Sequence, residues 1–159
     1  MADYDIITVG GGVAGAALAK AMAERGKRVL VVERETQFKD RVRGEWVAPW
    51  GVIEAKELGL WDDIVAAGGH TPTFFATRAG PMPLPPRNVL EDCAANEPQL
   101  TIFHPELQEA LLAAAEKAGA EVRRGVKVQG VKPGAEPSVE LDGETVTARL
   151  VVGADGRNS

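Results

Sequence analysis

Three consecutive glycines at positions 10–12, followed by Gly15, form the pattern Gly-x-Gly-x-x-Gly near the start of the chain. Residues 4–9 form a short, β-branched run that predicts a buried strand. Residues 13–25 have the composition of a helix, and residues 28–32 form a second apolar, β-branched run. A strand, a helix and a second strand within about 30 residues predict a βαβ unit with parallel strands.

The spacing of the glycines suits the binding of a dinucleotide. The first glycine of such a loop permits a tight turn, the second lets a phosphate approach, and the third lets helix and strand pack closely. Gly10, Gly12 and Gly15 occupy these positions. The free N–H groups at the helix start, where Val13 and Ala14 lie, then favour the charge of a pyrophosphate. The alternative is a flexible turn before an alanine-rich helix.

An acidic residue follows the second predicted strand. Glu33 comes eighteen residues after Gly15, where a carboxylate accepts hydrogen bonds from ribose hydroxyls on the adenine side of a dinucleotide. Its alternative interpretation is a solvated charge at a strand end. A carboxylate there disfavours a ribose 2′-phosphate, although the neighbouring Arg34 would soften the repulsion. The simplest ligands are therefore FAD or NAD.

Composition excludes several classes of function. The 159 residues suffice for one domain, and the net charge of −5 without basic clusters argues against nucleic acid or an anionic membrane as a partner. The single cysteine, Cys93, forms no internal disulfide, which favours a cytoplasmic location. The uncharged run at residues 6–19 contains four glycines and is too short to span a bilayer.

The middle of the chain has weaker patterns. Residues 37–49 predict an ordered loop, and residues 50–58 and 61–67 predict two short helices. More than half of the ten prolines lie in residues 71–99. Such a segment is typical of an edge strand, an extended arm or a loop, and not of a central element.

Regular patterns return in the last third. Residues 105–118 predict a helix that begins with a proline, and residues 121–131 predict a strand. Asp142 and Gly143 separate two short apolar runs and indicate a hairpin. Residues 150–152 predict a further buried strand that leads directly into Gly-Ala-Asp-Gly.

Four stretches together resemble one family. They are YDIITVGGGVAGAALAKAMAERGKRVLVVER, DRVRGEWVAPWGVIEAKELGLWDDI, HPELQEALLAAAEKAGAEVRRGVKV and VVGADGRNS. The chain is similar here to the FAD-dependent aromatic monooxygenases, the para-hydroxybenzoate hydroxylase-like flavoproteins. The last stretch is the most diagnostic, since an Asp-Gly pair after a buried strand marks this group. The resemblance implies that Glu33 contacts the adenosine ribose of FAD and that Arg34 lies beside the adenine.

The resemblance implies further contacts with FAD. Arg43 would lie along the cofactor near its flavin, its alternative being a surface arginine. His104 stands where relatives carry an arginine or glutamine that reaches the ribityl phosphate, its alternative being a helix-capping histidine. The backbone of Val128, at a strand position, would face the adenine. Asp155 and Gly156 would border the pyrophosphate, whereas the stretch seen alone is typical of a plain turn.

The resemblance also implies an architecture and an activity. We expect a three-layer, Rossmann-like α/β fold with a parallel sheet and a small β-meander at residues 131–148. Residues 1–159 would form one FAD-binding domain, with residues 71–100 as an excursion toward a substrate domain that this chain lacks. The chain would be the N-terminal part of a longer flavoprotein, without turnover by itself. The intact enzyme would be a monooxygenase in which NAD(P)H is the transient electron donor and O2 the oxidant.

The expected substrate is an aromatic or polyketide-like small molecule, and no catalytic side chain is assigned because the cofactor carries the chemistry. The other interpretations are an NAD-binding dehydrogenase domain, a flavin halogenase or geranylgeranyl reductase-like protein, and a non-catalytic nucleotide-binding module. A metal site is not expected, since His70 and His104 lack further ligands at suitable spacing. Trp46, Trp50 and Trp61 are interpreted as packing residues more than as a substrate wall. The sequence leaves the oligomeric state open.

Overall fold

The computed structural model of the chain describes residues 2–41 and 45–156. The chain divides into two compact units, of which the first contains Met1–Lys39 with Gln108–Ser159 and the second contains Asp40–Leu107. The expected excursion at residues 71–100 lies wholly in the second unit. Within the described residues, no helix has both the length and the apolar character needed to cross a membrane.

The first unit is built around one six-stranded sheet with the order β10-β11-β12-β1-β2-β9. Its elements are β1 (Tyr4–Val9), α1 (Val13–Ala23), β2 (Val29–Glu33), most of α4 (His104–Lys117), β9 (Glu121–Arg124), β10 (Gly130–Lys132), β11 (Ser138–Leu141) and β12 (Glu144–Gly153). Strands β12, β1, β2 and β9 run parallel, and β10, β11 and β12 pair antiparallel. The predicted βαβ unit is thus confirmed as β1-α1-β2.

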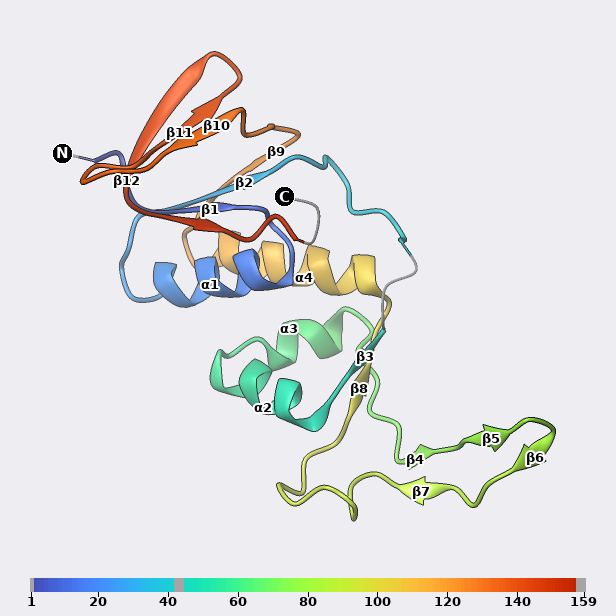
Figure 1. Ribbon diagram of the computed structural model, residues 1–159. Helices are drawn as coiled ribbons and strands as arrows, with labels where there is room; N and C mark the ends of the chain where they lie inside the picture. Colours follow the sequence, from blue (N-terminus) through green and yellow to red (C-terminus); the bar gives the residue numbers. More distant parts are fainter. Residues whose placement is uncertain (1, 42–44, 157–159) are drawn as a thin grey trace. The chain divides into compact units, whose positions relative to one another are not determined.

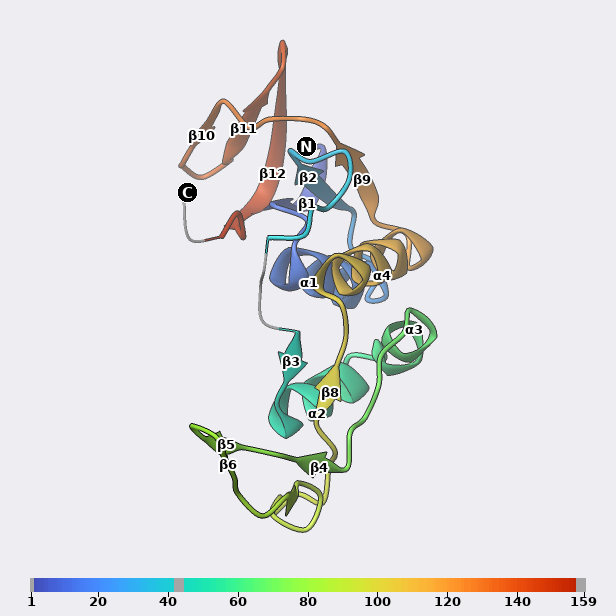
Figure 2. The same ribbon diagram turned by 90° about the vertical axis from the view of Figure 1, so that its right-hand side faces the viewer.

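The parallel strands are covered on both faces. Figures 1 and 2 show α1 and α4 together on one face, with the β10–β11 ribbon on the other side. The buried face of α1 consists mainly of alanines and Gly15, which lets the helix lie close to the strands. On the opposite face, Ile7 and Leu30 of the parallel strands pack with Val139 and Leu141 of β11. The three layers are therefore helices, parallel strands and an antiparallel ribbon.

Strand β12 belongs to both parts of this sheet. Its first half pairs antiparallel with β11, where Leu141 lies opposite Glu144. Its second half pairs parallel with β1, ending at the pair Val9 and Gly153. Asp142 and Gly143 connect β11 to β12, with Gly143 at φ +80°, as the hairpin prediction requires. The expected β-meander is present, and its last strand continues into the parallel sheet.

The prediction of one strand over residues 121–131 is wrong. Strand β9 ends at Arg124, and Gly125 follows with φ +71°, a conformation that breaks the extended backbone. The chain then reaches β10, at the opposite edge of the sheet from β9. The apolar residues in the break, Val126 and Val128, pack against the hydrophobic core without belonging to a strand. Their burial produced a strand-like pattern in the sequence.

The second unit contains short elements. They are β3 (Trp46–Val47), α2 (Pro49–Glu57), α3 (Trp61–Ala66), β4 (Phe74–Phe75), β5 (Arg78–Ala79), β6 (Met82–Pro83), β7 (Arg87–Asn88) and β8 (Leu100–Thr101). The two short helices confirm the prediction to within one residue at each end. Strand β3 pairs antiparallel with β8. Strand β3 lies in residues 37–49, for which the sequence predicts only an ordered loop.

The proline-rich segment forms a long antiparallel hairpin. Strand β4 pairs with β7, and β5 pairs with β6 nearer the turn. Gly80 lies in that turn with φ +63°. Figure 1 shows this hairpin, drawn in yellow-green, as an extended excursion of the chain. Of the three predicted alternatives, an edge strand, an extended arm or a loop, the structure has the extended arm.

Candidate nucleotide-binding site

Three segments meet at the carboxyl edge of the parallel strands, following β1, β2 and β12. The N–H of Gly10, after β1, donates a hydrogen bond to the carbonyl of Val32 in β2 at 2.8 Å. The N–H of Ala154, after β12, donates to the carbonyl of Val9 at 2.8 Å. These bonds fix the start of each loop to the neighbouring strand. The loop after β1 and the segment after β12, which are both expected to border the pyrophosphate, are therefore adjacent.

Two of the glycines are required by close packing. Gly10 has φ +106°, and a Cβ atom there would lie 2.5 Å from the carbonyl oxygen of Ala154. A Cβ atom on Gly15 would lie 1.9 Å from the carbonyl oxygen of Gly10. Either side chain would overlap backbone atoms that cannot move independently. The tight turn and the close packing of helix on loop depend on these residues.

Gly12 differs because the space beside it is open. Among the described residues beyond its chain neighbours, the nearest atom to a Cβ placed there is Nε2 of Gln108, at 3.7 Å. Gly12 is also the N-cap of α1, so no side chain caps the helix, and its first turn contains no acidic residue. Val13 and Ala14, the first helical residues, are exposed. The positive end of the helix dipole thus faces a space that the missing side chain leaves free.

Glu33 is buried against the glycine loop. Its Oε2 accepts a hydrogen bond from the N–H of Gly11 at 2.7 Å, and its Oε1 accepts one from the N–H of Glu35 at 2.8 Å. Only 7% of the residue is exposed. The interpretation as a solvated charge is therefore wrong. Two ionised oxygens offer about four acceptor positions, so the two bonds leave acceptor capacity for a ligand hydroxyl.

The segment after β2 is held by contacts among Arg124, Glu109 and Phe38. The sequence analysis did not predict these contacts. Arg124 in β9 binds the carboxylate of Glu109 in α4 through two bonds of 2.5 and 2.9 Å. Its guanidinium lies 4.7 Å from the ring centroid of Phe38, whose N–H donates to Glu109. The Arg124 hydrogen bond lowers the pKa of Glu109 below its usual 4.5. Arg124 is paired with Glu33 in the sheet, so these contacts support the end of β2 that carries the Glu33 carboxylate.

The other predicted residues on this side have simple environments. Arg34 is exposed and lies 3.8 Å from the Glu35 carboxylate. Val128 follows β9 in an irregular segment, so its expected strand position is wrong. Two residues before it, the N–H of Val126 donates to the carbonyl of Glu33 at the end of β2, at 3.1 Å.

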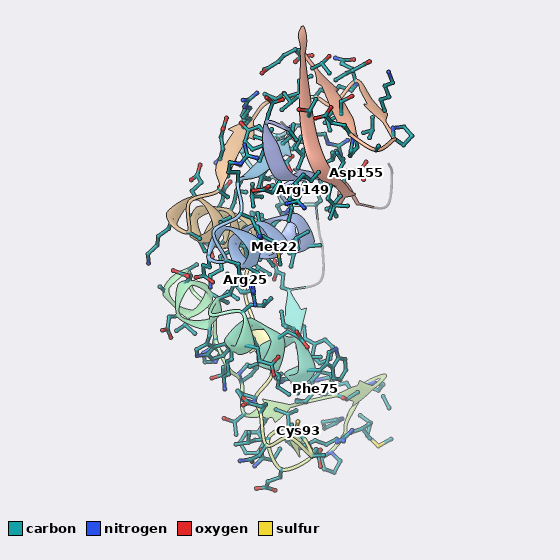
Figure 3. The ribbon with its side chains drawn as sticks, turned by 90° about the vertical axis from the view of Figure 1, so that its left-hand side faces the viewer. Met22, Arg25, Phe75, Cys93, Arg149 and Asp155 are labelled. Atoms are coloured by element: carbon teal, nitrogen blue, oxygen red, sulfur yellow. The ribbon has the colours of Figure 1, made fainter. Side chains whose placement is uncertain are left out.

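Asp155 and Gly156 end the described part of the chain. Both are exposed, and Gly156 has φ +91°. Figure 3 shows Asp155 directly after β12. The contact of Ala154 with Gly10 brings this segment to the glycine loop, which a plain surface turn would not require.

Two further predicted residues are Arg43 and His104. Arg43 is outside the described residues. His104 is the first residue of α4 and belongs to the second unit. Gln108, by contrast, lies beside Gly12, and the sequence analysis missed it. The available signal was its position on the helix one turn after His104.

The donor set of this edge fits a dinucleotide. It combines an uncapped helix N-terminus, a glycine with open space beside it and a buried carboxylate, the groups that bind a pyrophosphate and a ribose. The described residues contain no cluster of three or more His, Cys, Asp or Glu side chains able to hold a metal ion.

Comparison with known proteins gives a consistent picture. A family described as "FAD binding domain" matches residues 3–159. FixC of Salmonella typhi is 32% identical over 98% of this chain and 37% of its own length. Squalene epoxidase 3 of Arabidopsis thaliana is 52% identical over 38% of this chain and 11% of its own length. The chain therefore spans well under half of these relatives.

A solved structure has the same fold. The ternary complex of aklavinone-11 hydroxylase with FAD and aklavinone matches with a TM-score of 0.81 and 26% identity. The match covers 98% of this chain and 33% of that protein.

Proposed function

Because the chain belongs to the FAD binding domain family, we propose that its glycine loop binds the pyrophosphate of FAD. The observation that carries this proposal is the open space at Gly12, directly in front of the uncapped N-terminus of α1. The N–H groups of Val13 and Ala14 would donate to phosphate oxygens there. The side-chain amide of Gln108 is the polar group nearest to this space.

The remaining contacts follow from the same edge of the sheet. Glu33 accepts the ribose hydroxyls with its remaining lone pairs while it holds the loop through Gly11. Asp155 and Gly156 border the pyrophosphate, supported by the contact of their segment with Gly10. Arg34, Val128, Arg43 and His104 stay as proposed contacts to the adenine, the flavin side and the ribityl phosphate.

We further propose that the whole protein is a flavin-dependent monooxygenase that hydroxylates an aromatic or polyketide-like small molecule. The structural likeness to a hydroxylase crystallised with FAD and aklavinone supports this class. Bound FAD, reduced by NAD(P)H, would supply the electrons and activate O2. The residues of this chain would bind and orient that cofactor. The chain by itself would bind FAD without turnover.

Separate titrations of the purified chain with FAD and with NAD test this proposal. We expect FAD to bind, to remain with the protein through gel filtration and to give it the flavin absorption bands, whereas NAD gives no heat of binding by calorimetry. Binding of NAD without FAD would instead support a dehydrogenase domain. Binding of neither would support a non-catalytic module.

A further inference from the structure

A cavity of about 530 Å³ lies within the second unit and is lined by none of the residues assigned to the nucleotide-binding site. This volume is in the range of pockets that hold small organic ligands, roughly 300–1,000 Å³. Its walls come from β3, α2, β4, β7 and the segment between β7 and β8, and include Trp46, Trp50, Phe75, Cys93 and Gln99. Figure 3 labels Phe75, in β4, and Cys93, in the segment that follows β7.

The aromatic lining is exposed and not packed. Trp46 and Trp50 are 51% and 71% exposed, and Phe75 is 50% exposed. The two indole rings meet edge to face, with centroids 6.4 Å apart and an interplanar angle of 86°. The interpretation of these two tryptophans as packing residues is therefore wrong. Exposed indole faces of this kind bind flat apolar rings well.

Gln99 supplies a directed polar group. It is 4% exposed, and its Oε1 accepts a hydrogen bond of 2.7 Å from Nε1 of Trp46. This bond fixes the orientation of the amide, since the indole N–H only donates. Among the described residues no acceptor meets the amide nitrogen of Gln99, which lines the cavity. Since this nitrogen keeps some solvent exposure, an acceptor on a ligand in the cavity can reach it.

The cavity carries no unpaired charge among its described lining residues. Its two charged members, Arg87 and Asp92, bind each other at 2.8 Å between Nε and Oδ2. A charged ligand would lose its hydration without gaining a free counter-ion. A neutral ligand fits this wall better.

We propose that this cavity binds a neutral, planar, fused aromatic molecule that presents a carbonyl or similar oxygen to the Gln99 amide. The rings lie against Trp46, Trp50 and Phe75, and the oxygen accepts the hydrogen bond that the Gln99 nitrogen otherwise lacks. The role of such a molecule as the substrate rests on the proposed function, whereas its binding rests on the second unit alone.

The test uses the purified chain at pH 8 with two probes that differ in one oxygen. Fluorenone is planar, neutral and carries a carbonyl, and fluorene has the same rings without it. Binding is followed by tryptophan fluorescence and by the rate at which a maleimide labels Cys93, the only cysteine of the chain. FAD is titrated into the same preparation.

We expect fluorenone to slow the labelling of Cys93 and to bind about 3- to 10-fold more tightly than fluorene, the usual effect of one hydrogen bond. Gln99→Glu keeps an acceptor for Trp46 and removes the donor, so it should erase this preference. Trp50→Ala, at an exposed position, should weaken both probes alike. Circular dichroism confirms that each variant is folded, and Trp50→Ala still tests the cavity if Gln99→Glu does not fold.

Equal affinity for the two probes, or a preference that survives Gln99→Glu, overturns the proposal. A labelling rate of Cys93 that fluorenone does not change overturns it as well. A Cys93 that maleimide does not label even without a probe, because another segment covers the cavity, also overturns it. FAD binding with no fluorenone binding would overturn this inference alone. Fluorenone binding with no FAD binding would overturn the proposed function and leave the cavity assignment standing.

Discussion

The N–H of Gly11 lies 2.7 Å from Oε2 of Glu33, in a buried contact between the glycine loop and the end of β2. The acidic residue that marks this class of βαβ unit thus holds the loop in place before any ligand is present. The second oxygen of Glu33 does the same for the turn that follows, through the N–H of Glu35. One side chain therefore shapes the site and offers lone pairs to a ligand.

Replacement of Glu33 should lower stability as well as affinity. Glu33→Ala leaves the N–H groups of Gly11 and Glu35 without their acceptors, which costs about 1–3 kcal/mol. Glu33→Gln keeps one oxygen and should cost less. Urea unfolding followed by circular dichroism measures both. Wild-type stability of Glu33→Ala would show that the loop does not depend on this carboxylate.

Gly15→Ala should be strongly destabilising. Its Cβ would lie 1.9 Å from the carbonyl oxygen of Gly10, so the loop or the helix has to move, at a cost of about 3 kcal/mol or more. Gly153→Ala is the matched control, since the nearest atom to its Cβ is Oδ1 of Asp155 at 3.9 Å. Thermal unfolding of the two variants compares them. Equal midpoints would contradict the packing described for the loop.

Tyr4, the only tyrosine, should titrate above its usual pKa of 10.0. Partial burial raises this pKa, and so does the hydrogen bond of 2.5 Å that its hydroxyl donates to Glu121. A raised pKa in the folded state stabilises the protein below pH 10 and loses this effect as pH rises through the folded value. Absorbance at 295 nm measures the midpoint, which should fall in Glu121→Gln and in urea. A native midpoint equal to that in urea would refute the contact.

Acid should destabilise the first unit partly through Glu109. Its pKa is lowered by the hydrogen bond from Arg124, so its contribution is complete above the unfolded pKa near 4.5 and disappears as pH falls through the lower folded value. Glu109→Gln should therefore lose less stability than the wild type between pH 5 and 3. Glu136→Gln, at an exposed position, is the control. Parallel curves for Glu109→Gln and wild type would exclude this role.

The sequence predicted the parts of the fold that local chemistry determines. The glycine loop, the hairpin at Asp142 and Gly143, and the end of β12 all depend on turn residues and on apolar runs. The prediction of a strand over residues 121–131 failed because Val126 and Val128 pack against the core and do not pair in a strand. Burial against the core leaves the same pattern as a strand.

Side-chain partners from distant segments could not be read from the sequence. Gln108 of α4 lies beside Gly12, and Arg124 of β9 binds Glu109 of α4, only because the fold packs α4 against these segments. Trp46 and Trp50 line a cavity with side chains that are half or more exposed, which composition and spacing do not indicate.

The most direct test of the central claim is the FAD affinity of Gly12→Val compared with the wild type, by calorimetry. The open space beside Gly12 lets this variant fold, and the new side chain occupies the position proposed for the pyrophosphate. Wild-type thermal stability with a loss of FAD affinity of at least 100-fold is the predicted result. Unchanged FAD affinity in a folded Gly12→Val protein would contradict the assignment of this loop as the cofactor site.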